Sequence, residues 1–349
     1  MAAPSGLSRE HSLLLGILRG DDPATLRAGM ASPFNWDRFC SVALSNGVAP
    51  LVYVQLKSAG LLSAIPPVVE SKCGLALYKA ALRNAAVREQ LIALTGPLRQ
   101  EPIAVFVKGA VLAWTVYADP GLRRMTDIDL ISLGSYRERV RRLLAQNHFV
   151  LQDTHWKGFG ISVDDYHHVE AGVRLDVGFF PDRPLASVWA RRIVVENADL
   201  QLPTLSWEDH LVYICVHALG HLLTSGGICL LWLYDLDQLL RWNGSRPEWE
   251  WSRVEASADE FGVRNVLYFM LSLARTLLGT RHGMDPRPIS RLRQRVLTKT
   301  FADARLCLAG GPGWTIPSSS RTLLNLACLV DHRRVVYRLA MRLFNLRGR

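Results

Sequence analysis

Over the first hundred residues, apolar positions lie three and four apart, which is the period of amphipathic helices. The runs at 8–20 and 36–62 follow this spacing, and a pair of prolines separates the second run from the next. The stretch 77–100 is rich in Ala, Leu and Arg, which are strong helix formers. The pattern therefore predicts a helical region over residues 1–99.

The pattern changes after Pro102, where short β-branched and aromatic runs alternate with helical spacing. In chain order the pattern predicts a strand at 103–107, a helix at 110–118, a strand at 127–132, a helix at 135–147, a strand at 148–152 and a hairpin within 167–180. The hairpin is expected to turn at Ala171-Gly172. Strands that alternate with helices indicate a mixed α/β sheet.

Helical spacing returns from about residue 183 and continues to the end of the chain. The expected helices are 206–224, 228–242, 250–279 and a basic C-terminal one at 323–349. We therefore predict an α/β (α+β) fold, in which a small mixed-sheet core over 100–182 is wrapped by the N-terminal helical region 1–99 and a C-terminal helical domain 183–349.

Composition narrows the class of protein. Of 349 residues, 49% are hydrophobic and 21% charged, as in ordinary globular proteins. The N-terminal segment lacks the order of a secretory signal, and no window reaches the about 18 uninterrupted apolar residues typical of a membrane span. The six cysteines form no CxxC pair. We expect a cytoplasmic protein with reduced thiols and no transmembrane segment.

The net charge is +10, and arginines outnumber lysines 35 to 6. A basic chain attracts nucleic acids, nucleotides and anionic membrane surfaces. A solvated basic face without a specific partner accounts equally well for the same composition. The charge alone therefore leaves the partner open.

Two aspartates, Asp127 and Asp129, interrupt an apolar run, where carboxylates are disfavoured. Two positions apart on a strand, they lie on one face about 7 Å apart, while Ile128 and Leu130 face the core. Such a pair can bind a hard cation such as magnesium together with phosphate. If the strand that carries Asp176 is a neighbour, three carboxylates converge and suit two metal ions for phosphoryl transfer. A lone DxD pair is also common at solvated strand ends.

The residues before this strand add phosphate-binding chemistry. Lys108 and Gly109 follow one predicted strand and open a helix, where glycine permits close backbone approach and helix N–H groups favour anions. Lys108 adds a positive charge for a phosphate. Arg123 and Arg124 stand in the loop just before the acidic strand, from which we expect them to reach polyphosphate oxygens. Together these residues predict a nucleotide site.

The block VFVKGAVLAWTVYADPGLRRMTDIDLIS, residues 105–132, resembles the KG, R and DxD block of the uncharacterised bacterial nucleotidyltransferases of the polymerase-β-like superfamily. Flanking helical segments resemble that family as well, so the resemblance covers roughly residues 35–280. It implies that Asp127 and Asp129 are the metal-binding pair and Asp176 the third acid.

The same resemblance places Lys108 and Gly109 in the nucleotide-phosphate turn, where the wider superfamily usually has Gly-Ser. Arg123 matches the family's arginine four residues before the first aspartate, and Arg124 fills a less constrained position. Gly178 is a departure, because family members often carry a histidine two residues past the third acid. This departure bears on the assignment of Asp176.

Further candidates lie on the predicted C-terminal helices. His217 and His221 are four apart and share a helical face, but no glutamate follows His217 as a zinc-hydrolase motif requires. We expect them to line an acceptor cleft between the core and the C-terminal helices, or to pack in the interior. Asp235 and Asp237 cannot share a cation on a helix, because side chains two positions apart point about 200° apart. We expect one of these two to pair with an arginine.

These observations predict magnesium-dependent transfer of a nucleoside monophosphate from a nucleoside triphosphate to an acceptor hydroxyl, with release of pyrophosphate. The expected cofactors are two Mg²⁺ ions, and the acceptor is a small molecule, an RNA or a protein. Two alternatives stay open. The same fold acts on tRNA as a toxin-like enzyme, or the chain is a catalytically silent module that binds a nucleotide or a partner protein.

Overall fold

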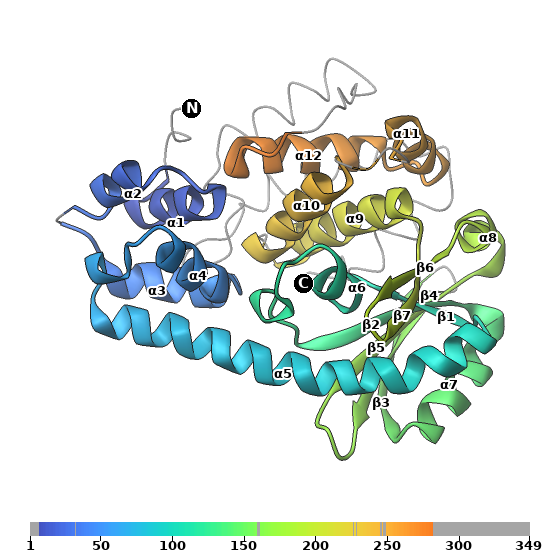
Figure 1. The fold of residues 1–349 in the computed structure, drawn as a ribbon. Coiled ribbons are helices and arrows are strands. Elements are labelled where there is room, and N and C mark those ends of the chain that lie inside the picture. Colours follow the sequence, from blue (N-terminus) through green and yellow to red (C-terminus); the bar gives the residue numbers. More distant parts are fainter. Residues whose placement is uncertain are drawn as a thin grey trace.

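The structure is a computed structural model that describes residues 7–31, 33–158, 161–225, 227, 229–244, 246 and 249–281. The C-terminal helix expected at 323–349 lies outside these residues. The architecture matches the expected fold class, because a mixed sheet is surrounded by helices that precede and follow it in the chain (Figure 1). The predicted α/β (α+β) class is confirmed.

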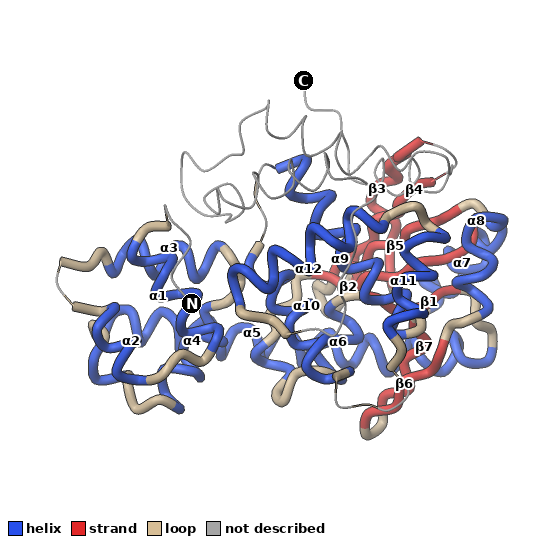
Figure 2. The backbone as a smooth tube through the Cα atoms, turned by 90° about the horizontal axis from the view of Figure 1, so that it is seen from above, coloured by secondary structure: helices blue, strands red, loops and turns tan. Residues whose placement is uncertain are grey.

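Helices occupy the N-terminal region as expected. They are α1 (Arg9–Arg19), α2 (Pro23–Gly29), α3 (Trp36–Ser45), α4 (Ala49–Ser58), the short 3-10 helix η1 (Leu62–Ala64) and the long α5 (Pro67–Gln100). The side chains of Ser8 and Asp22 cap the first two helices, and Gly20 ends α1 with a φ of 74°, a backbone conformation that favours glycine. Figure 2 shows α1–α4 at one end of the molecule and the sheet at the other, with α5 joining them.

In the described part of the chain, the sheet has seven strands in the order β3-β4-β5-β2-β1-β7-β6. Its strands are β1 (Ala104–Val107), β2 (Asp127–Leu133), β3 (Phe149–Gly158), β4 (Ile161–His168), β5 (Arg174–Phe180), β6 (Ile193–Asn197) and β7 (Leu200–Thr204). The pairs β2–β5 and β1–β7 are parallel, and the other neighbours are antiparallel. The expected hairpin is present as β4 and β5.

The short helices between the strands are α6 (Gly109–Thr115), η2 (Pro120–Leu122), η3 (Gly134–Tyr136), α7 (Arg137–Gln146) and α8 (Asp182–Ala190). The two faces of the sheet are covered differently. The C-terminal half of α5, with Leu91 and Leu94, packs on the face that carries Ile128. Helix α8, with Val188, packs on the opposite face beside Ile131. Asp127 and Asp129 share this second face, because side chains alternate along a strand.

The region after residue 182 is not purely helical, which corrects the sequence expectation. Strands β6 and β7 form an antiparallel pair there, and β7 joins the core sheet beside β1. Each strand has five residues and carries polar as well as apolar side chains, so neither shows a strong alternating pattern. The division of the chain at residues 99/100 and 182/183 stays a prediction. The sheet, however, contains strands from both sides of the second boundary, because β1–β5 precede it and β6 and β7 follow it.

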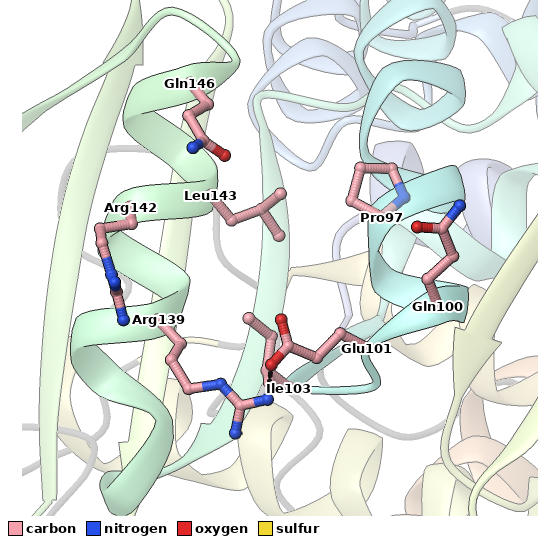
Figure 3. A pocket seen from close by; sticks show the side chains of 8 residues that line it. All are labelled: Pro97, Gln100, Glu101, Ile103, Arg139, Arg142, Leu143 and Gln146. Carbon is pink, nitrogen blue, oxygen red and sulfur yellow. Dashed lines mark ion pairs between the residues drawn. The ribbon is translucent and has the colours of Figure 1, made fainter.

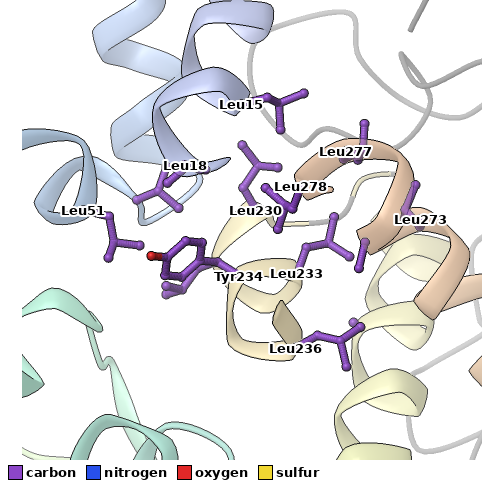
Figure 4. Close-up of a cluster of buried hydrophobic side chains, with 14 of the residues drawn as sticks. Leu15, Leu18, Leu51, Leu230, Leu233, Tyr234, Leu236, Leu273, Leu277 and Leu278 are labelled. Carbon is purple, nitrogen blue, oxygen red and sulfur yellow. The ribbon is translucent and has the colours of Figure 1, made fainter. Parts of the chain in front are cut away.

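Among the residues that the structure describes, four helices follow the sheet: α9 (Trp207–Ser225), α10 (Leu230–Asn243), α11 (Trp251–Glu260) and α12 (Arg264–Leu278). The expected helix at 250–279 is divided at Gly262, whose φ of 65° interrupts it. Apolar side chains of α10 and α12 share one buried cluster with the N-terminal helices, and Leu15 and Leu51 lie beside Leu230 and Tyr234 there (Figure 4). The two helical regions therefore form a common core.

Among the described residues, no individual helix has the length and apolar character needed to cross a membrane. Helices α3 and α4 meet that test only when taken together, and they are bent by 120° at the break between them.

Candidate active site

The predicted convergence of acids is present in the sheet. Strands β2 and β5 are parallel neighbours, and their register places Asp129 opposite Asp176 and Asp127 opposite Arg174. Paired residues on adjacent strands project from the same face, so Asp127, Asp129 and Asp176 lie together. Ile128 between the first two is fully buried on the other face. The sequence correctly predicted this arrangement, and the roles of the three acids stay a prediction.

The acidic row continues across two more strands. Asp165 on β4 pairs in register with Asp176, and Asp153 on β3 pairs with Asp165. His155 Nε2 lies 2.7 Å from an Asp165 oxygen and 3.4 Å from an Asp153 oxygen, so this imidazole lies between the two carboxylates at the outer end of the row. A hairpin centred between Ala171 and Gly172 would instead pair Asp176 with His167. For this reason the sequence did not identify Asp165.

The carboxylates of Asp127, Asp129 and Asp176 repel one another, and this repulsion contributes to the raised pKa values of Asp129 and Asp176. Burial raises the pKa of Asp176 to about 7, helped by the neighbouring charges of Asp129, Asp127 and Asp165. Burial also raises the pKa of Asp129, although Lys108 acts against it. Asp176 Oδ1 is buried and has no hydrogen-bond partner. This carboxylate is therefore under-compensated by the groups around it.

Lys108 stands at the end of β1 in a strained conformation, with φ 55° and ψ −129°. Its backbone N–H donates to His210 Nε2 at 2.9 Å, and its Nζ donates to Asp129 Oδ1 at 2.5 Å. Burial alone would lower the pKa of Lys108, but the charges of Asp129, Tyr213 and Asp127 raise it, so the side chain keeps its proton. The predicted Lys-Gly turn thus lies directly against the acidic strand.

Gly109 serves a purpose that the sequence did not reveal. A Cβ at this position would lie 2.3 Å from Arg123 Nη1 and 2.7 Å from Arg123 Cζ, both well inside contact distance. The absence of a side chain at Gly109 therefore leaves room for the guanidinium of Arg123. The expected approach of a phosphate to Gly109 stays a prediction.

The guanidinium of Arg123 is buried and binds Asp235 on α10 through Nη2 at 2.8 Å and Nε at 3.2 Å. Its Nη1 donates to the Arg124 carbonyl, and the Tyr117 hydroxyl donates to Asp235 Oδ1 at 2.7 Å. The network joins the loop before β2 to the C-terminal helices. Contact of Arg123 with phosphate stays a prediction, and in this structure its N–H groups face protein acceptors.

Arg124 is exposed and lines a groove of about 420 Å³ beside α5. Its predicted role in nucleotide binding is untested. The expectation that Asp235 or Asp237 pairs with an arginine is confirmed for both, because Asp237 Oδ2 accepts from Arg241 Nε at 2.7 Å.

One face of α9 borders the site. His210, Tyr213, His217 and His221 follow one another at intervals of three and four residues, so they lie along the same side of the helix. Burial lowers the pKa of His210 to about 3, and this neutral imidazole stacks on Trp207. Because Nε2 accepts the Lys108 N–H, the ring holds the Lys108 turn in place.

Tyr213 is the next residue on this face of α9. Its phenol pKa is raised to about 12, first by burial and then by Asp129 and Asp176, against the effect of Lys108. The hydroxyl therefore keeps its proton beside the acids. The sequence analysis missed both His210 and Tyr213, although their spacing from His217 was visible.

His217 and His221 contact each other, with ring centroids 4.6 Å apart, and both contact Trp232 on α10. Burial, followed by the nearby charges of Lys108 and His221, holds the pKa of His217 well below its ordinary value. The two histidines thus lie where α9 and α10 meet, close to the Lys108 turn. Their role in an acceptor cleft stays a prediction.

The donor set fits a hard divalent cation. Within the described part of the chain, no three His, Cys, Asp or Glu side chains already stand in metal-binding geometry, and the Lys108 ammonium neutralises Asp129 instead. Even so, Asp127, Asp129 and Asp176 offer carboxylate oxygens on one face, and the buried Asp176 Oδ1 is unpartnered. Oxygen donors of this kind suit Mg²⁺.

A separate pocket of about 360 Å³ lies between the end of α5 and α7 (Figure 3). Glu101 is the one acid among its lining residues, and it is paired with Arg139. This pocket therefore lacks the uncompensated carboxylates that mark the sheet face.

Comparison with known proteins agrees with the predicted family. A solved structure described as an antigenic nucleotidyltransferase-like protein from Paracoccidioides brasiliensis is 15% identical, covers 55% of this chain and 91% of its own, and has a TM-score of 0.33. That similarity is too low to bear on the site, and comparison with curated proteins gives no significant match. The model of a family described as uncharacterised nucleotidyltransferase matches residues 32–279, which include the whole site. The chain therefore belongs to this uncharacterised nucleotidyltransferase family.

Proposed function

We propose that the chain is a magnesium-dependent nucleotidyltransferase, which transfers the nucleoside monophosphate of a nucleoside triphosphate to an acceptor hydroxyl. One observation carries the proposal. Asp129 and Asp176 are paired in register beside Lys108, and a buried oxygen of Asp176 has no partner within the protein. Buried carboxylates without compensation mark functional sites more often than stabilising ones.

In this proposal Asp127, Asp129 and Asp176 hold divalent ions. When bound, such ions neutralise the triphosphate and lower the pKa of the acceptor hydroxyl. Lys108 is positioned to turn from Asp129 towards a phosphate, because its ammonium lies at the edge of the acid group and keeps its proton. His210 holds the backbone of Lys108 during this exchange.

The reaction forms a bond between the acceptor oxygen and the α-phosphorus and breaks the bond from that phosphorus to the bridging oxygen of the leaving pyrophosphate. The hydroxyl proton passes to the carboxylate of Asp176, which has a buried oxygen without a hydrogen-bond partner within the protein. The side chains of the protein contribute mainly position and charge.

The proposal is tested by incubating the pure protein with Mg²⁺, nucleoside triphosphates labelled at the α-phosphate, and a cell lysate as the source of acceptor. Wild type is expected to label a discrete species and to release pyrophosphate, whereas Asp129→Asn and Asp176→Asn are not. Asp153→Asn is the matched control, because it removes the same charge at the exposed outer end of the acidic row. Equal labelling by wild type and Asp129→Asn would contradict the assignment.

The chemical nature of the labelled species decides between acceptors. Labelled tRNA would support the toxin-like alternative, and binding of that tRNA should then weaken steeply as salt increases. If wild type binds a nucleotide but labels nothing and releases no pyrophosphate, the silent binding module replaces the enzymatic proposal.

A further inference from the structure

Helix α5 presents an apolar stripe to solvent. Five large apolar side chains on this helix are between 38% and 62% exposed: Val68, Leu75, Tyr78, Leu82 and Ile92. In Figure 1, the first half of α5 runs along the lower border of the molecule, beneath α3 and α4, and β3 and α7 lie below its C-terminal end. Monomeric proteins seldom expose a row of large apolar side chains along one helix, so this face is a candidate interface.

The spacing of the stripe is that of a coiled-coil seam. Val68, Leu75 and Leu82 are seven residues apart, and Tyr78 and Ile92 fall at the second apolar position of the same heptads. The stripe spans about 36 Å along the helix, at 1.5 Å per residue. The opposite side of α5 is anchored in the core by Val87, Leu91 and other buried residues. The exposed seam is therefore held rigidly and is available to a second helix.

The charges along the stripe favour one arrangement. Lys72 and Glu89 are both exposed, lie near opposite ends of the stripe, and take part in no ion pair among the described residues. In an antiparallel pair of α5 helices centred near residue 80, Lys72 of each copy lies beside Glu89 of the other, and Tyr78 faces Leu82. A parallel pair would place like charges together.

We propose that two copies of this chain associate through antiparallel packing of their α5 helices. The arrangement is a closed two-fold contact, in which the same surface serves both copies. The stripe also adjoins the groove that is lined by Leu44, Pro50 and Leu75, which extends the apolar surface beyond the helix. The contact lies away from the acids of the sheet, so it is independent of the proposed transferase activity.

Sedimentation equilibrium of the full chain over a range of concentrations tests the proposal. Wild type is expected to be a dimer, and Leu82→Glu is expected to weaken the association at least about a hundredfold, because two buried leucines are lost per dimer. Leu151→Glu is the matched control, because Leu151 is similarly exposed on β3 and should leave association unchanged. A wild-type monomer at all concentrations, or a dimer unaffected by Leu82→Glu, would overturn the proposal.

Charge reversal tests the direction of packing. Lys72→Glu and Glu89→Lys should each weaken association by about five- to tenfold, and the double variant should restore it. Failure of the double variant to recover would contradict the antiparallel arrangement. Circular dichroism of each variant confirms that its fold is retained.

Discussion

Asp235 and Asp176 both place carboxylate oxygens in the interior near the acidic strand, but their surroundings are opposite. Asp235 accepts hydrogen bonds from the Tyr117 hydroxyl and from two guanidinium nitrogens of Arg123. Asp176 has a buried oxygen without a partner and lies beside Asp129 and other acids. The first carboxylate is satisfied within the chain and ties two regions together. The second is left under-compensated within the chain, which is the condition expected of a binding site.

The largest expected effect on stability comes from removing the arginine that is paired with Asp235. Arg123→Ala leaves Asp235 buried without its cation and should lower the free energy of unfolding by about 3–5 kcal/mol. Arg253→Ala is the control, because both members of the Arg253–Glu250 ion pair are exposed, so a loss below about 1 kcal/mol is expected. Urea unfolding measures both. Equal losses would show that Arg123 is not a structural anchor.

A second variant tests the close contact between Gly109 and Arg123. Gly109→Ala places a Cβ 2.3 Å from Arg123 Nη1 and should displace the guanidinium, with a loss of about 2–3 kcal/mol in unfolding free energy. Because both substitutions disturb the same ion pair, the double variant Gly109→Ala/Arg123→Ala should lose less than the sum of the single losses. Strict additivity in urea unfolding would rule out this explanation for the glycine.

Removing the charge of the under-compensated Asp176 should have the opposite effect and stabilise the protein. In metal-free buffer at pH 8, Asp176→Asn removes a charge that its neighbours oppose and should raise the free energy of unfolding by about 2 kcal/mol. Asp153→Asn should leave stability nearly unchanged, because Asp153 is exposed. If Asp176→Asn destabilises the metal-free protein, the acid is structural and the contrast with Asp235 fails.

The affinity for metal should depend on pH through the same residue. The pKa of Asp176 is about 7 without a cation, so below pH 7 a divalent ion must displace a proton in order to bind. Mg²⁺ affinity should therefore fall by about tenfold, or about 1.4 kcal/mol, between pH 8 and pH 6. Calorimetric titration at several pH values measures it. The same pH dependence in Asp176→Asn would assign the proton to another group.

Much of the inner site was predictable, because its signals are local. The two aspartates of β2 stand out against an apolar run, and the Lys-Gly pair follows a short β-branched strand. The juxtaposition of Asp129 and Asp176 required only that β2 and β5 be neighbours. The resemblance to the family was sharpest in the same block of residues, and the family model matches residues 32–279, which include that block.

The remaining features depend on contacts that are distant in sequence. The partner of Arg123 lies 112 residues later on α10, and the acceptor for the Lys108 N–H lies 102 residues later on α9. No local pattern specifies either pairing. Strands β6 and β7 were missed because they are short and only weakly alternating, and Asp165 was missed because a shift in hairpin register changes which residue faces Asp176.

The most direct test of the account is calorimetric titration of each nucleoside triphosphate with Mg²⁺ into wild type and Asp129→Asn. We predict magnesium-dependent binding of at least one nucleotide by wild type, and loss of that binding in Asp129→Asn with the fold intact. No binding by folded wild type, or equal affinity in both proteins, would contradict the claim that the under-compensated acids of β2 and β5 form a metal and nucleotide site.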